Sequence, residues 1–108
     1  MRRGELYRVY RGNKNDPKDY RVFVIVSRQA LLESRFATVI CAPVYSTSVM
    51  LSTQFEVGVE EGMKTQSYVF CDELVSIEKS RLSHYVGSLG PVKMAKLESA
   101  LKIAVGIE

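Results

Sequence analysis

One apolar run, Arg21-Val-Phe-Val-Ile-Val-Ser27, constrains the fold of this chain more than any other segment. β-Branched and aromatic residues favour strands, and this run has almost no polar interruption, so we expect a strand that is covered on both faces. The segment Ala37–Tyr45 predicts a second apolar strand. Pro43 cannot donate a ladder hydrogen bond, which predicts a sheet edge or a bulge near the end of this strand. A β-sheet therefore forms the centre of the predicted fold.

Shorter segments complete the predicted sheet. Phe55, Val57 and Val59 alternate with polar residues or glycine, which predicts a half-exposed strand. The remaining predictions are strands at 6–10, 67–71, 74–77 and 85–89, and short helical turns at 28–34, with Ser27 as a candidate cap, and at 78–82.

The C-terminal segment is predicted to be an amphipathic helix. Pro91 is at a favourable first helical position, and Gly106 is placed to end the helix. Between them, apolar residues recur at steps of three and four, at Met94, Leu97, Leu101, Ala104 and Val105. We expect this helix to cover the sheet, because a small β domain needs an apolar partner for its open face. The predicted fold class is mainly β (α+β), in one domain over residues 1–108.

Composition limits the classes of protein to consider. The chain is 46% hydrophobic and 25% charged, which is typical of a folded globular protein, and its net charge of +3 permits a polyanionic partner. The N-terminus lacks the apolar stretch of a signal peptide, and no apolar run has membrane-spanning length, so we expect a soluble, cytoplasmic protein. Cys41 and Cys71 both fall in predicted strands, which favours buried thiols over a disulfide or a reactive pair.

Several kinds of chemistry have no support in the sequence. His84 is the only histidine, and it follows a helical turn, where a surface or cap role is the more common one. There is no glycine-rich phosphate loop, no histidine–cysteine metal cluster and no nucleophile elbow. Asp72 and Glu73 are adjacent and in a strand would point to opposite faces, so they do not form a ready metal pair. We therefore expect no metal and no cofactor.

The residues that remain suit a phosphate. Arg21 opens the apolar strand, and a guanidinium is planar, always charged and forked for phosphate. Other candidates are Ser46, Thr47 and Ser48 after the second strand, Asp72, and the loop bases Lys14 and Lys18, with Tyr10, Tyr20 and Tyr45 able to stack on bases. Each residue also has an ordinary structural role, as a salt bridge, a turn or a backbone acceptor. Together they fit cleavage of single-stranded RNA, which carries its own nucleophile, the 2′-hydroxyl.

Six segments occur in a particular order: Arg3-Gly-Glu-Leu-Tyr7, Arg21-Val-Phe-Val-Ile-Val-Ser27, Thr38-Val-Ile-Cys-Ala-Pro-Val-Tyr-Ser46, Val69-Phe-Cys-Asp-Glu-Leu74, Ser76-Ile-Glu-Lys-Ser-Arg-Leu82 and Val86-Gly-Ser-Leu89. In this order, and with the closing helix, they resemble the MazF/PemK (Kid) toxins of bacterial type II toxin–antitoxin modules. The resemblance covers essentially the whole chain. It implies an SH3-like barrel or CcdB–MazF-like twisted sheet with the C-terminal helix packed on it. It also implies a homodimer and a cognate antitoxin.

The resemblance further implies metal-independent, sequence-specific cleavage of single-stranded RNA, with 2′,3′-cyclic phosphate and 5′-hydroxyl products. Arg21 matches the catalytic arginine of the family, whereas Tyr45 is at the position of its threonine. The expected partner of Arg21 is Tyr45, or Ser46 or Thr47 after a small shift in the loop. Asp72 matches an aspartate used by Kid-type members. The RNA-binding candidates are Lys14, Lys18, Tyr20 and Arg28.

Two other classes stay open from the sequence. One is a non-catalytic toxin of the same fold that binds a protein target such as gyrase, as CcdB does. The other is a plain RNA-binding module. Tyr45 in place of the family threonine allows either an altered nuclease site or weak or absent cleavage.

Overall fold

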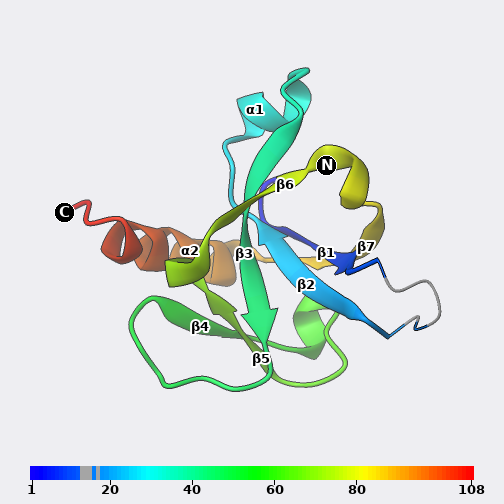
Figure 1. Ribbon diagram of the computed structural model, residues 1–108. Helices are drawn as coiled ribbons and strands as arrows, with labels where there is room; N and C mark the ends of the chain where they lie inside the picture. Colours follow the sequence, from blue (N-terminus) through cyan, green and yellow to red (C-terminus); the bar gives the residue numbers. More distant parts are fainter. Residues whose placement is uncertain (13–15, 17) are drawn as a thin grey trace.

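Seven antiparallel strands form one curled sheet in the computed structural model, which describes residues 1–12, 16 and 18–108 (Figure 1). The strand order is β4-β5-β3-β2-β1-β7, and β6 also pairs with β3. The strands are β1 (Glu5–Tyr10), β2 (Tyr20–Ile25), β3 (Thr38–Tyr45), β4 (Gln54–Val57), β5 (Ser67–Phe70), β6 (Val75–Glu78) and β7 (His84–Ser88). The helices are α1 (Gln29–Glu33), α2 (Pro91–Ala104) and the 3₁₀ turns η1 (Val59–Glu61), η2 (Cys71–Glu73) and η3 (Lys79–Arg81). The predicted fold class is confirmed.

Strand β3 is in the centre of the sheet and pairs with β2 in a continuous register, so the predicted edge or bulge at Pro43 is wrong. One side of β3 pairs with β2, where Pro43 is opposite Phe23. On the other side, residues 38–41 pair with β6 and residues 44–45 pair with β5. Pro43 therefore lies where β3 changes its partner, an interval in which a missing backbone N–H is tolerated inside the sheet.

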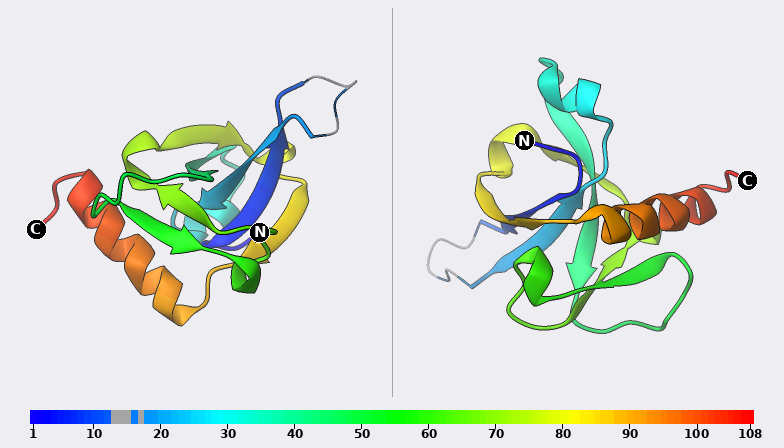
Figure 2. Two further views of the ribbon diagram at one scale, coloured as in Figure 1. Left: turned by 90° about the horizontal axis from the view of Figure 1, so that it is seen from below. Right: turned by 180° about the vertical axis from the view of Figure 1, so that it is seen from behind.

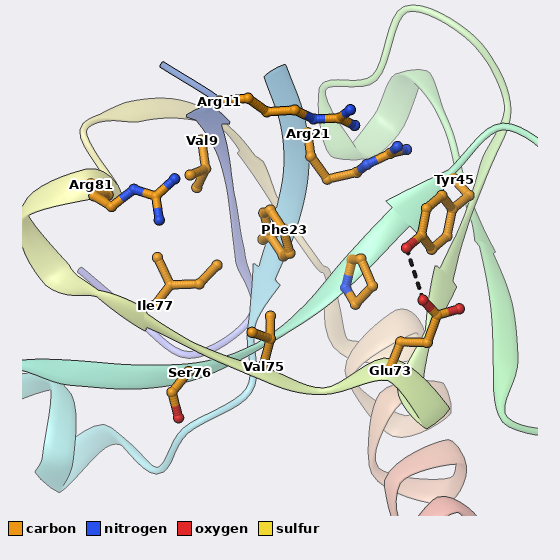
Figure 3. Close-up of a pocket in the computed structure, with 11 residues that line it drawn as sticks. Val9, Arg11, Arg21, Phe23, Tyr45, Glu73, Val75, Ser76, Ile77 and Arg81 are labelled. Atoms are coloured by element: carbon orange, nitrogen blue, oxygen red, sulfur yellow. Dashed lines mark hydrogen bonds between the residues drawn. The ribbon is translucent and has the colours of Figure 1, made fainter. Parts of the chain in front are cut away.

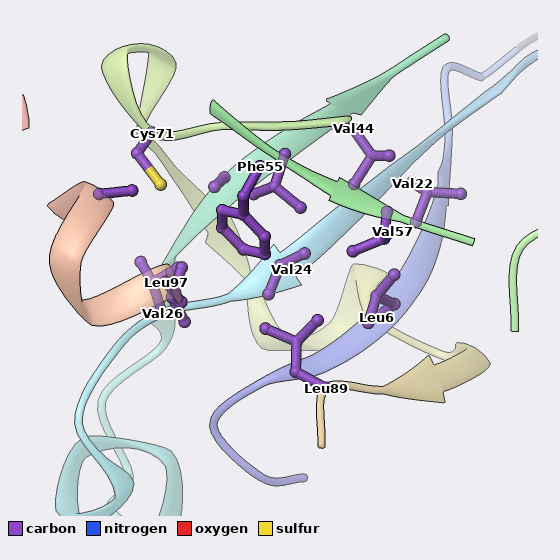
Figure 4. Close-up of a cluster of buried hydrophobic side chains, with 13 residues drawn as sticks. Leu6, Val22, Val24, Val26, Val44, Phe55, Val57, Cys71, Leu89 and Leu97 are labelled. Carbon is purple, nitrogen blue, oxygen red and sulfur yellow. The ribbon is translucent and has the colours of Figure 1, made fainter. Parts of the chain in front are cut away.

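Strand β2 is covered on both faces, as its uninterrupted apolar composition predicts. Val22, Val24 and Val26 face the larger core, which Figure 4 shows around Leu97 of helix α2. Ile25 faces a second cluster on the other side of the sheet, made of Tyr7, Val9, Ile25, Leu32, Val39, Cys41, Ile77 and Leu82, with Phe23 packed against it. Because side chains alternate along a strand, Arg21 shares the face of Phe23 and Ile25.

Helix α2 packs on the sheet through a narrow apolar stripe. It lies beside β4 and η2 (Figure 2), with Leu97 and Ala100 buried and Met94, Leu101 and Ala104 half-buried. Pro91 is at the start of the helix, as predicted, and Gly106 follows its end with a positive φ of 75°. Val105 was predicted to continue the stripe but is exposed, because the helix ends at Ala104.

Two local predictions are wrong because backbone groups find other partners. The alternation at 55–59 stops at Val57, because the Gly58 amide donates a hydrogen bond of 2.7 Å to the Glu61 carboxylate and starts η1. Val59 is consequently exposed in that turn. Ser27 does not cap α1, because its hydroxyl instead accepts a hydrogen bond from the Ile40 amide.

The cysteines are buried free thiols, as predicted. Burial raises the pKa of Cys41 to about 12 and, together with the neighbouring Asp72 charge, raises the pKa of Cys71 to about 11. Both side chains therefore act as small apolar groups in the core. Within the described residues, no helix combines the length and the apolar character needed to cross a membrane.

The packing of α2 predicts unequal costs for two substitutions on this helix. Leu97 is fully buried, so Leu97→Ala should lower the free energy of unfolding by about 2–5 kcal/mol through lost burial and the cavity left behind. Val92 is 71% exposed, and Val92→Ala should change the free energy by no more than about 0.5 kcal/mol. Urea unfolding monitored by circular dichroism measures both. Equal costs would contradict the packing described.

Candidate active site

An open pocket of about 430 Å³ lies on the face of the sheet that carries the second apolar cluster (Figure 3). Its floor is apolar and its rim is charged. The lining residues are Val9, Arg11, Arg21, Phe23, Pro43, Tyr45, Glu73, Val75, Ser76, Ile77 and Arg81. Strands β1, β2, β3 and β6 supply most of them, Arg21 included, whereas Arg11, Glu73 and Arg81 come from segments that adjoin these strands.

Arg21 is held at the rim by two residues of the adjacent strand β3. Its Nη1 donates a hydrogen bond of 3.3 Å to the Val44 carbonyl oxygen, and its Cζ lies 4.3 Å from the centre of the Tyr45 ring. Stacking of a guanidinium on an aromatic face contributes about 0.5–1 kcal/mol at a solvent-accessible site. One of the five N–H donors of Arg21 is thus used for positioning, and the others can bind an anion.

Tyr45 connects Arg21 to a carboxylate. Its hydroxyl donates a hydrogen bond of 2.9 Å to Oε1 of Glu73, drawn as a dashed line in Figure 3. Its ring also packs edge-on against Phe70, with ring centres 4.7 Å apart. Burial raises the pKa of Tyr45, and the hydrogen bond and charge of Glu73 raise it further, while Arg21 and Arg11 lower it. Tyr45 is therefore held as a neutral phenol.

Glu73 enters the pocket, whereas its neighbour Asp72 does not line it. Both residues lie in the 3₁₀ turn η2, between β5 and β6. The Asp72 carboxylate accepts a hydrogen bond of 2.6 Å from the hydroxyl of the buried Thr53. Successive side chains in a 3₁₀ turn point about 120° apart, which separates the two carboxylates.

Arg11 and Arg81 add two more guanidinium groups to the pocket. Arg11 has a loose ion pair with Asp19, 3.7 Å from its Nε, and Arg81 donates a hydrogen bond of 3.3 Å to the Tyr10 carbonyl oxygen. The described part of the lining thus carries three arginines and one carboxylate, Glu73. Among the described residues, Arg21 and Arg81 have no ion-pair partner within 4.0 Å. This surplus of positive charge fits an anionic ligand.

A family model for the PemK-like, MazF-like toxins of type II toxin–antitoxin systems matches residues 2–105. The chain belongs to this toxin family. A solved structure described as an endoribonuclease in complex with its cognate antitoxin, from a mycobacterial species, is 26% identical. It aligns with 100% of this chain and 97% of its own, at a TM-score of 0.84.

Two more solved structures match the toxin. One is described as an endoribonuclease from a mycobacterial species; it is 26% identical, covers 99% of the toxin and 92% of its own chain, and has a TM-score of 0.80. The other, Mycobacterium tuberculosis toxin MazF-mt6, is 21% identical, covers 96% and 98% of the two chains, and agrees in fold at a TM-score of 0.82. The resemblance stated from the sequence is therefore confirmed.

The hydroxyls after β3 lie outside the toxin's pocket. Ser46 and Thr47 are exposed beyond the end of the strand, and neither lines the pocket. Ser48 is engaged in its own loop, where its hydroxyl donates a hydrogen bond of 2.6 Å to Gln54. Of the residues predicted to partner Arg21, Tyr45 lines the pocket with it and contacts it, through the ring and not the hydroxyl.

The predicted RNA-binding residues of the toxin are dispersed. Lys18 is exposed in the loop before β2, and Lys14 lies outside the described residues. Tyr20 is on the face opposite Arg21, where it packs against the larger core and beneath the Arg8 guanidinium. Arg28 is exposed before α1 and lines a separate hollow with Phe36 and Ile40. Their roles in RNA binding stay predictions.

Sequence reasoning missed Arg11, Arg81 and the carboxylate of Glu73 as site residues. Arg11 was detectable, because it follows Val9 by two residues and so continues the same face of the strand. Arg81 belongs to one of the segments that carry the family resemblance. Glu73 belongs to another of these segments, but it was considered only together with Asp72 as a metal pair and was set aside. No group of three or more His, Cys, Asp or Glu side chains is placed to hold a metal ion within the described parts of the toxin.

The contacts of Tyr45 predict opposite effects of two substitutions on its titration. The pKa of Tyr45 should lie above that of free tyrosine, about 10. Glu73→Gln should lower it, because a negative charge that disfavours the phenolate is removed, and Arg21→Ala should raise it, because a favourable positive charge is lost. Ultraviolet titration of each protein, minus the matching protein with Tyr45→Phe, isolates this phenol. Shifts in the same direction, or none, would contradict the geometry.

Proposed function

We propose that this toxin is a metal-independent endoribonuclease that cleaves single-stranded RNA at specific sequences. Products would carry a 2′,3′-cyclic phosphate and a 5′-hydroxyl. The observation that carries the proposal is the Arg21 guanidinium, held over Tyr45 at the rim of a pocket with two further arginines. The names of two solved relatives at 26% identity, both endoribonucleases, support it.

Arg21 would stabilise the charge that develops on the phosphate oxygens. The attack of the 2′-oxygen on phosphorus places additional negative charge on those oxygens, and donors that are already positioned stabilise it without reorganisation. The Val44 carbonyl and the Tyr45 ring fix Arg21 before RNA arrives. The protein therefore needs to supply alignment, charge and proton transfer, while RNA supplies the nucleophile.

Arg11 and Arg81 would hold the phosphates on either side of the cleaved bond. Arg11 directly follows β1 and Arg81 lies in η3, both at the pocket rim, while Phe23 and Pro43 form an apolar floor suited to a base. Lys14, Lys18 and Arg28 remain candidates for contacts with more distant phosphates. Binding through several arginines should weaken as salt concentration rises.

The proposed partners are a cognate antitoxin and a second copy of the chain. One solved relative is described as a complex with its cognate antitoxin. Large apolar side chains are exposed at Val75 in the pocket and at Phe36 and Ile40 in the separate hollow, surfaces consistent with a partner. We place this activity in the cytoplasm.

Light scattering on the purified toxin should give twice the mass of one chain, because the toxin is proposed to be a homodimer. A monomer mass at all concentrations would overturn the proposed homodimer.

The decisive test is cleavage of long single-stranded RNA in excess EDTA. The wild-type toxin should produce discrete cuts, and Arg21→Ala should slow them by about 10²–10³-fold, the effect of losing one transition-state donor. Arg35→Ala is the matched control, because Arg35 is exposed and lies away from the pocket. This control should cleave within about 3-fold of the wild type. Primer extension locates the cuts and measures their rates.

Three results would overturn parts of the proposal. Cleavage that is lost in EDTA and restored by a divalent metal would show a metal-dependent site. Cleavage that is unchanged by Arg21→Ala would remove Arg21 from the mechanism. RNA binding without cleavage by the wild type would leave a plain RNA-binding module.

A further inference from the structure

We propose that Glu73 is the general base of the toxin and that Tyr45 positions it. This inference rests on the proposed endoribonuclease function. It assigns a proton acceptor to the pocket that sequence reasoning did not provide, since Asp72 was the carboxylate expected there.

Among the described residues that line the pocket, Glu73 is the single carboxylate. It comes from η2, on the side of the pocket that faces Tyr45, and Figure 3 shows its carboxylate directed at the Tyr45 hydroxyl. Within the described part of the chain, no arginine lies within 4.0 Å of it. A carboxylate that shares a pocket with three arginines and pairs with none of them remains available to a substrate.

The hydrogen bond from Tyr45 occupies one carboxylate oxygen of Glu73, and the other oxygen can accept the substrate proton. Tyr45 donates its one hydroxyl proton to Oε1, so Oε2 is the oxygen that can accept a proton from the 2′-hydroxyl. The same bond means that Tyr45 has no second proton to offer to a phosphate oxygen. Tyr45 therefore acts by orienting Glu73 and supporting Arg21, and this explains how a tyrosine is accommodated beside the arginine.

The proposed step balances as follows. The 2′-O–H bond breaks and its proton passes to Oε2 of Glu73, while the 2′-oxygen forms a bond to phosphorus. The bond between phosphorus and the 5′-oxygen breaks, and that oxygen takes a proton from solvent water, which reaches the open pocket. Glu73 then returns its proton to solvent. Arg21 stabilises the phosphate oxygens throughout, and no oxidant, reductant or metal is consumed.

Single-turnover cleavage in EDTA tests this assignment, with a transcript whose cut site has been mapped. Glu73→Gln keeps the shape and the hydrogen bond from Tyr45 but removes the base, so the rate should fall by about 10²–10⁴-fold. Glu78→Gln is the matched control, because Glu78 is exposed on β6 and does not line this pocket. It should cleave within about 3-fold of the wild type. Tyr45→Phe should lose less activity than Glu73→Gln.

Two further readouts separate a base from a structural role. The cleavage rate of the wild type should rise with pH along an acidic limb, and this limb should vanish in Glu73→Gln. Affinity for the same RNA with a 2′-deoxy nucleotide at the cut should be unchanged by the substitution, which shows that the pocket is intact.

The failures are distinguishable. Glu73→Gln that cleaves at the control rate, or that keeps the acidic limb, would overturn the role of Glu73 while the endoribonuclease function stands. Loss of affinity equal to the loss of rate would make Glu73 a binding residue. A wild type that does not cleave would overturn both proposals.

Discussion

The burial of β2 on both faces is the constraint on which the rest of the structure depends. Val22 and Val24 anchor the strand in the core beneath α2, while Ile25 anchors it in the second cluster. A strand fixed from both sides cannot slip by one residue without exposing its apolar side chains. Arg21 and Phe23 therefore have one orientation, toward the pocket, and the site inherits its rigidity from the two cores.

The site itself adds little to stability, and that frees its residues for chemistry. Arg11 and Glu73 are exposed and Arg21 is half-buried, so their interactions are screened by water and are worth at most about 1 kcal/mol each. The site holds these side chains without a strained backbone and without a deeply buried charge. In the Arg21–Tyr45–Glu73 series, one aromatic residue instead holds a cation against its ring and a carboxylate at its hydroxyl.

The sequence predicted those elements of the fold that depend on a local pattern of apolar residues. The run at 21–27 and the spacing of apolar residues in α2 gave the correct elements, because burial on two faces or on one stripe leaves a direct trace in composition. Pro43 misled because its tolerance depends on where β3 exchanges one partner strand for another, and this is a non-local fact. Arg21 and Tyr45 were both named, yet Glu73 was not, because a 3₁₀ turn after β5 reverses which of two adjacent carboxylates reaches the pocket.

The central claim is that the toxin lets RNA attack itself at a phosphate held by Arg21. The chemistry of the new RNA ends tests this most directly. Mass spectrometry of fragments produced in EDTA should find a 2′,3′-cyclic phosphate on one end and a 5′-hydroxyl on the other. Fragments with a 3′-hydroxyl and a 5′-phosphate would mean that water is the nucleophile, and would contradict the account.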